Sequence, residues 1–87
     1  MRHSDDCTSI GSLKENVGKF VKDREWEKFH NPKDLAEAIC IEAAELLEVF
    51  QWTSSDEAVR QIGDTSKLER IEEELADVLV YCLSLAN

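Results

Sequence analysis

The sequence predicts an all-α fold, an antiparallel helical bundle. Its 87 residues include only 3 Gly and 1 Pro, and they are rich in the helix formers Glu, Leu and Ala. Apolar residues recur at the three- and four-residue spacing of a helix face, and no segment alternates with the period of two typical of a strand. A chain this short buries only about 60–65% of its unfolded surface. We therefore expect the core to be completed by oligomerisation, as a homodimer or homotetramer.

The chain is predicted to consist of a flexible tail, residues 1–9, and one helical domain, residues 10–87. The first helical pattern runs from about Ser12 to Arg24 or Trp26. It places four apolar residues on one face: Leu13, Val17, Phe20 and Val21.

A second helix is predicted from Pro32 to about Trp52. Asn31 can cap it, Pro32 suits the first helical position, and Asp34 complements the first turn. Two capping-box patterns follow. Ser54 with Glu57 predicts a short third helix, and Ser66 with Glu69 predicts a last helix that continues almost to the end of the sequence.

The charge balance excludes several classes of function. The chain has 19 Asp+Glu against 10 Lys+Arg, a net charge of -9, which argues against binding a nucleic-acid polymer or an anionic membrane. No apolar run approaches the roughly 18–20 residues of a membrane span, and the polar N-terminal segment lacks a signal peptide's apolar stretch. Cys40 and Cys82 lie in apolar contexts and are expected to be small buried thiols, which favours a cytoplasmic location.

Several carboxylates fall on the apolar side of the two long helices. On a helical wheel, Glu42 lies near the middle of the apolar stripe of the second helix, and Glu45 lies at its edge. Glu74 and Asp77 flank the apolar face of the last helix, one turn apart. Carboxylates in an apolar interior are costly unless they are paired or metal-bound, and Mg²⁺ prefers carboxylate oxygens. The pattern favours a magnesium site, with a buried ion pair to Lys or Arg as the alternative.

These residues resemble a known family. The segment EAAELLEVFQW followed by EEELADVLVY resembles the ExxE…ExxD signature of the MazG-like all-α nucleoside triphosphate pyrophosphohydrolases. The preceding REWEKFHNPKDLAEAI resembles the dCTP pyrophosphatase branch. The similarity covers about Leu13 to Ala86. It implies an enzyme, a hydrolase dependent on Mg²⁺ (with Mn²⁺ as an alternative), that converts dCTP or a modified pyrimidine deoxynucleotide to the monophosphate and pyrophosphate in nucleotide-pool sanitation.

The resemblance also implies a role for eight residues. Four match the metal ligands, Glu42, Glu45, Glu74 and Asp77, and we expect Glu42 or Glu45 to orient the attacking water. Four match substrate-binding positions: Trp26, His30, Trp52 and Tyr81. For the tryptophans the alternative is simple core packing, and for His30 it is a loop histidine that bonds backbone near Asn31.

The chain departs from the family at its C-terminal end. Family members commonly continue into a further helix with basic and amide side chains that hold phosphates, and the sequence stops at Asn87. Either the sequence is shortened or that helix is absent. If that helix is absent, a non-catalytic helical module that binds nucleotide or another protein is the alternative function.

Overall fold

The computed structural model describes residues 4–87, with the exception of the Phe29 side chain. Every regular element in these residues is helical, which confirms the all-α prediction. The elements are α1 (Ile10–Asp23), the short 3₁₀ helix η1 (Glu27–Phe29), α2 (Pro32–Val49), α3 (Ser55–Gln61) and α4 (Thr65–Ala86). No helix of the described residues is both long and apolar enough to cross a membrane.

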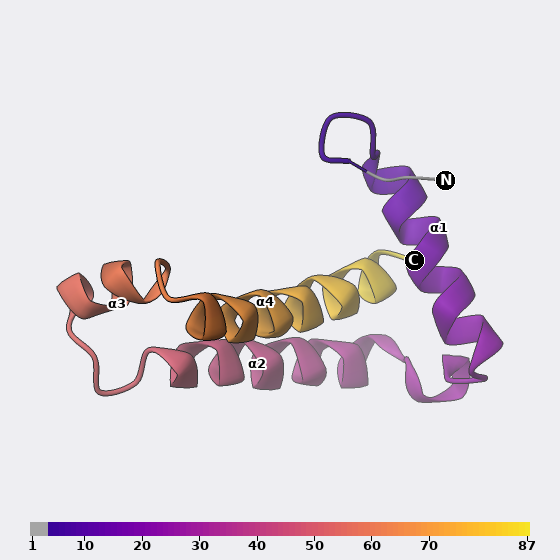
Figure 1. Cartoon of the computed structure of the whole chain (residues 1–87). Coiled ribbons are helices and arrows are strands. Elements are labelled where there is room, and N and C mark those ends of the chain that lie inside the picture. The colour runs from indigo at the N-terminus through magenta and orange to yellow at the C-terminus, as the bar shows by residue number, and fades with distance from the viewer. Residues whose placement is uncertain (1–3) are drawn as a thin grey trace.

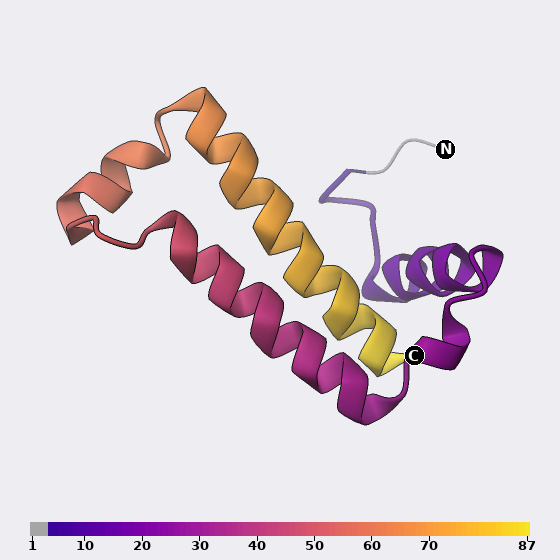
Figure 2. The same ribbon diagram turned by 90° about the horizontal axis from the view of Figure 1, so that it is seen from below.

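The two long helices form an antiparallel pair. α2 and α4 lie side by side, and α3 connects them at one end (Figures 1 and 2). At the other end α1 crosses the C-terminal part of α4 (Figure 1). A hydrogen bond joins the two helices at this crossing: the Asn87 side-chain amide donates to the Lys14 carbonyl at 2.9 Å. Gly18 lies at this crossing, where a Cβ would make an ordinary van der Waals contact with the Asn87 side chain, 3.4 Å from its amide nitrogen.

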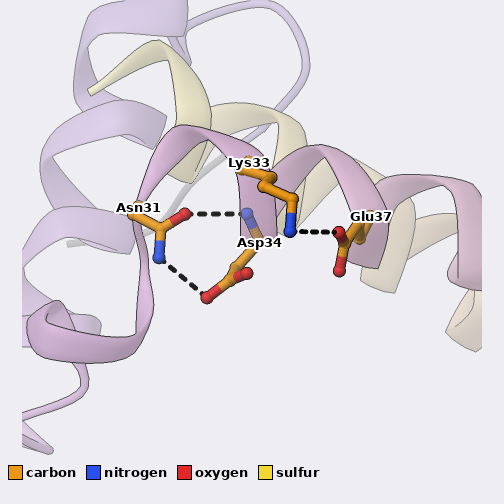
Figure 3. A network of polar contacts seen from close by, with 4 residues as sticks. All are labelled: Asn31, Lys33, Asp34 and Glu37. Atoms are coloured by element: carbon orange, nitrogen blue, oxygen red, sulfur yellow. Dashed lines mark hydrogen bonds and ion pairs between the residues drawn. The ribbon is translucent and has the colours of Figure 1, made fainter.

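Short polar side chains begin the helices. Asn31 caps α2 as predicted, accepting a 2.9 Å hydrogen bond from the Asp34 amide and donating one of 2.7 Å to its carboxylate (Figure 3). Ser54 caps α3 as predicted. The prediction for α4 was wrong in its cap: Asp64, and not Ser66, accepts from the first amides, so the helix starts at Thr65. Asp64 is the cap because its carboxylate accepts hydrogen bonds at a helix N-terminus more strongly than the Ser66 hydroxyl does.

The other helix boundaries shift by a few residues. Ser9 caps α1, so the helix starts at Ile10, ahead of the predicted Ser12. α2 ends at Val49, before the predicted Trp52. The tail predicted for residues 1–9 lies partly outside the described residues, and within it residues 4–7 form a turn closed by the hydrogen bond from the Cys7 amide to the Ser4 carbonyl.

The core of a single chain is thin. Its buried apolar side chains are Val21, Leu35 and Leu83, and among the described residues none is completely buried. The radius of gyration is 15.1 Å, against about 12 Å for a compact domain of this length. Cys40 and Cys82 are exposed, so the prediction of buried thiols was wrong for the isolated chain. The reason is that two helices packed side by side leave the rest of each apolar stripe without a partner.

Candidate functional site

Three carboxylates converge between α2 and α4. Glu42 and Glu45 come from α2 and Glu74 comes from α4, and one carboxylate oxygen of each lies within 4.8 Å of the others. The three-residue spacing on α2 places Glu42 and Glu45 one turn apart on the same face. The two helices pair antiparallel (Figure 2), and Glu74 of α4 thereby comes close to both. The structure thus groups three of the four metal ligands that the sequence predicts.

The environment of this cluster favours protons or a cation. Desolvation raises the pKa of Glu42, and the neighbouring carboxylates, Glu45 first among them, raise it further. The pKa of Glu74 is raised for the same reasons, again with desolvation as the largest cause. One oxygen of Glu42 and one of Glu74 are inaccessible to water and have no hydrogen-bond partner. Both glutamates are half-buried, so these oxygens lack the partner that buried polar atoms normally have.

Asp77 lies at the edge of the cluster. Its charge contributes to the raised pKa of both Glu42 and Glu74, although its carboxylate is outside the group of three. Arg70 acts on the cluster, but it lowers the pKa of Glu74 less than burial and the neighbouring carboxylates raise it, so the salt-bridge alternative does not account for the three glutamates. Clustered carboxylate oxygens without hydrogen-bond partners fit a hard divalent cation such as Mg²⁺.

A pocket adjoins the acidic cluster. It has a volume of about 430 Å³ and lies between α1, the η1 loop and α4, and Asp77 forms part of its wall. Three of the four predicted substrate-binding residues line it: Trp26, His30 and Tyr81. Most of the remaining wall is aliphatic or aromatic. An apolar pocket with a few convergent polar groups is the usual form of a small-molecule site.

Trp26 is placed by the way α1 ends. Glu25 adopts a left-handed conformation with φ 55°, and the amides of Glu25 and Trp26 bond the carbonyls of Lys22 and Val21, each at 3.0 Å. This is the Schellman arrangement, which turns the residue after the left-handed position back toward the helix. Trp26 then meets Phe20 edge to face, with ring centroids 5.6 Å apart. It nevertheless stays 43% exposed, so core packing alone does not account for it.

His30 and Tyr81 face each other across the chain. Their ring centroids are 6.3 Å apart, although they belong to the η1 loop and to α4. The Nδ1 atom of His30 is buried and has no hydrogen-bond partner. The alternative in which this ring bonds backbone near Asn31 is therefore not realised through Nδ1.

Trp52 lies apart from the other predicted site residues. It follows α2, whereas His30 precedes it, and the 18 residues of α2 span about 27 Å. Its side chain is 92% exposed, and its backbone has φ 68°. A positive φ in a bulky residue is a true outlier. Within one chain the structure therefore separates Trp52 from the pocket.

The pocket also contains residues that sequence reasoning missed. Asn16, Val17 and Phe20 of α1 form the wall opposite α4. Asn16 lies three residues after Leu13 and four before Phe20, so it flanks the apolar face of α1 as Glu74 flanks that of α4. That spacing was the available signal, but only the crossing of α1 over α4 shows what the face lines.

Known proteins resemble this chain closely. The model of the MazG-like family matches residues 38–87. The dCTP pyrophosphatase 1 proteins of Rattus norvegicus and Homo sapiens are 41% and 40% identical over 68 residues, 78% of this chain. The chain spans about 40% of the length of these relatives. The crystal structure of a pyrophosphatase from Archaeoglobus fulgidus matches with a TM-score of 0.80 and 43% identity, covering 98% of this chain and 76% of that one. The chain therefore belongs to the MazG-like family.

Proposed function

We propose that the protein is a Mg²⁺-dependent nucleoside triphosphate pyrophosphohydrolase that acts on dCTP or a modified pyrimidine deoxynucleotide. The observation that carries this proposal is the position of Asp77, which belongs both to the wall of the apolar pocket and to the surroundings of the acidic cluster. A nucleotide has an aromatic base at one end and a polyanionic phosphate chain at the other. An apolar pocket beside a cation site suits both ends. The names of the relatives support dCTP as the substrate.

The residues of the chain divide the task. Glu42, Glu45 and Glu74 would hold Mg²⁺, with Asp77 completing the set. When bound, Mg²⁺ would neutralise the cluster and supply Lewis-acid chemistry for the phosphates and for water. Glu42 or Glu45 would orient the water that attacks the α-phosphorus. The bond from the α-phosphorus to the oxygen that bridges it to the β-phosphate breaks, pyrophosphate leaves with that oxygen, and the proton of the attacking water is released to solvent. Trp26 would stack on the base. Stacking of a base on an aromatic side chain contributes roughly 1–3 kcal/mol to the binding free energy.

The site is best completed by a second copy of the chain. The isolated chain exposes 6871 Å², whereas a compact monomer of 9.9 kDa exposes roughly 5,200 Å². α4 presents an apolar stripe along one side, in which Leu75 is 55% and Leu79 49% exposed, followed by the exposed Cys82. We propose that this stripe packs against another copy in a homodimer or homotetramer. The strained, exposed Trp52 would reach the nucleotide pocket of another copy, since it lies too far from its own.

Pool sanitation in the cytoplasm is the role that this activity would serve. Removing a nucleoside triphosphate as its monophosphate prevents a polymerase from using it.

Pyrophosphate release from a panel of nucleotides, with and without Mg²⁺, tests the proposal. Wild-type protein should release pyrophosphate from a pyrimidine deoxynucleoside triphosphate only with the metal. Glu42→Gln should lose turnover by two orders of magnitude or more, because the amide keeps the size of the side chain and removes the charge that holds the cation. Glu48→Gln is the matched control, on the exposed side of the same helix, and should remain fully active.

Two outcomes would contradict the proposal. Near-normal turnover of Glu42→Gln with Mg²⁺ would remove Glu42 from the metal site. The absence of pyrophosphate release from every nucleotide, together with nucleotide binding, would support the non-catalytic module instead.

A further inference from the structure

The lining of the apolar pocket includes Asn16, a polar residue whose side chain neither the acidic cluster nor the fold uses. Five residues of the lining can form hydrogen bonds through their side chains: Asn16, Trp26, His30, Asp77 and Tyr81. Asp77 is next to the cation site, and His30 and Tyr81 face each other on one side. Asn16 comes from α1 on the opposite side. It is the polar group of that wall.

The fold places no demand on the Asn16 amide. α1 is capped by Ser9 at its start and closes through backbone amides at its end. The side chain of Asn16 is exposed, and it makes no hydrogen bond or ion pair within the described residues. Asparagine is also a weak helix former in the interior of a helix. An unpaired amide in an apolar wall, four residues before Phe20, is therefore placed to bond a ligand.

The chemistry of the amide defines what it can read. Asparagine presents a carbonyl acceptor and an NH₂ donor side by side. The outer edge of cytosine presents an amino donor beside a ring-nitrogen acceptor, which complements the amide through two hydrogen bonds. Uracil and thymine present a ring NH beside a carbonyl, and the amide matches this edge after rotating by half a turn about χ2. An asparagine thus recognises a pyrimidine edge without strongly separating cytosine from uracil.

We propose that Asn16 binds the hydrogen-bonding edge of the pyrimidine base and sets the base preference of the site. The inference rests on the proposed function, because it takes the pocket to hold the base of a nucleotide. It also predicts that the site binds cytosine and uracil with similar affinity, because the amide can match the edge of either base. An aspartate at the same position would make only one of the two hydrogen bonds to either base, since a carboxylate accepts only. It would accept from the amino group of cytosine or from the ring NH of uracil, and in both bases its second oxygen would face an acceptor atom.

The test compares dCTP with dUTP for the wild type, Asn16→Ala and Asn16→Asp. Loss of a bidentate contact worth 1–3 kcal/mol should raise KM for both nucleotides roughly 5- to 150-fold in Asn16→Ala, with kcat nearly unchanged. Asn16→Asp should also raise KM for both nucleotides, because the carboxylate keeps only one of the two hydrogen bonds to either base, and the ratio of kcat/KM for dCTP over dUTP should change little. Glu15→Ala, an exposed neighbour outside the pocket lining, is the control and should leave both KM values unchanged. Alanine favours the helix, so the variant should fold.

A binding measurement separates the role of Asn16 from the proposed hydrolytic activity. Equilibrium binding of each nucleotide, followed by the fluorescence of Trp26 and Trp52, reports on Asn16 whether or not turnover occurs. If the wild type hydrolyses nucleotides but the Asn16 variants keep its KM for both nucleotides, the inference is wrong and the function stands. If no nucleotide is hydrolysed while Asn16→Ala weakens binding, the function is wrong and the assignment of Asn16 stands. If neither turnover nor binding is seen, both are wrong.

Discussion

Glu42 and Glu74 are the residues whose chemistry depends most on their neighbours. Each glutamate on its own helix would be an ordinary surface carboxylate. Brought together with Glu45 and partly withdrawn from water, both acquire a raised pKa, because burial and like charge disfavour the ionised form. Such a cluster stores electrostatic repulsion that a divalent cation relieves.

This repulsion predicts a pH dependence of stability without metal. The folded pKa of Glu42 lies above the ordinary value of 4.5, so the native state holds the proton more tightly than the unfolded state. Stability from this group is therefore lost as pH rises from about 4.5 through the raised folded pKa. Glu42→Gln removes the effect, so its melting temperature relative to the wild type should increase as pH rises through that range in metal-free buffer.

The same melting experiment contains its controls. Glu48→Gln should show no such trend, because its side chain is exposed. Mg²⁺ at neutral pH should stabilise the wild type more than Glu42→Gln, since the ion binds the folded state of the wild type. A difference between Glu42→Gln and wild type that stays constant with pH would show that the cluster is not strained in solution.

At the scale of the element, the end of α1 decides where Trp26 lies. The Schellman turn requires a left-handed residue at Glu25, a position where glycine is normally found. Asn31 then starts α2 five residues after Trp26. The exposed Lys33–Glu37 ion pair at 3.3 Å (Figure 3) stabilises that helix by only about a few tenths of a kcal/mol. The loop between α1 and α2 is therefore fixed mainly by the Schellman turn at the end of α1 and the Asn31 cap at the start of α2.

Glu25→Gly should stabilise the protein. A left-handed conformation costs an L-residue roughly 1 kcal/mol that glycine does not incur, so the free energy of unfolding should rise by about that amount in a urea titration. Glu25→Ala is the matched control: it removes the same carboxylate but keeps the Cβ, and it should give no gain. Equal stabilities of the glycine and alanine variants would mean that Glu25 is not left-handed in solution.

At the scale of the whole molecule, the apolar surface exceeds what one chain can bury. Leu79 lies in the exposed stripe of α4 together with Leu75 and Cys82. The proposed homodimer or homotetramer would supply most of the core that one chain lacks. Folding and assembly would then be linked, and stability would depend on protein concentration.

Leu79→Glu should disrupt this association. Burying a charge in an apolar interface is unfavourable, so the dissociation constant measured by ultracentrifugation should increase roughly tenfold or more. Leu79→Met keeps the apolar volume and should associate normally. Wild-type protein should melt at a higher temperature as its concentration is raised. A wild type that is monomeric at micromolar concentration, with a concentration-independent melting temperature, would contradict the proposed assembly.

Local interactions explain what the sequence alone determined. Helical periodicity, the Asn31 cap with Pro32 and the Ser54 cap are set by residues three or four positions apart, and they were predictable for that reason. The three-residue spacings of Glu42 with Glu45 and of Glu74 with Asp77 likewise place these carboxylates on or beside the apolar faces of their helices. Where two acceptors competed for the same helix start, as Asp64 and Ser66 did, the pattern alone chose wrongly.

Long-range packing decided the rest. The crossing of α1 over α4 creates the pocket and turns Asn16 into part of its wall, and no periodicity within α1 contains that information. The antiparallel pairing of α2 with α4 brings Glu74 to Glu42 and Glu45, but it also places Trp52 at the far end and leaves Cys40 and Cys82 exposed. An apolar stripe specifies that a face will be buried; which partner buries it is decided by the packing of whole helices, because the hydrophobic effect is not directional.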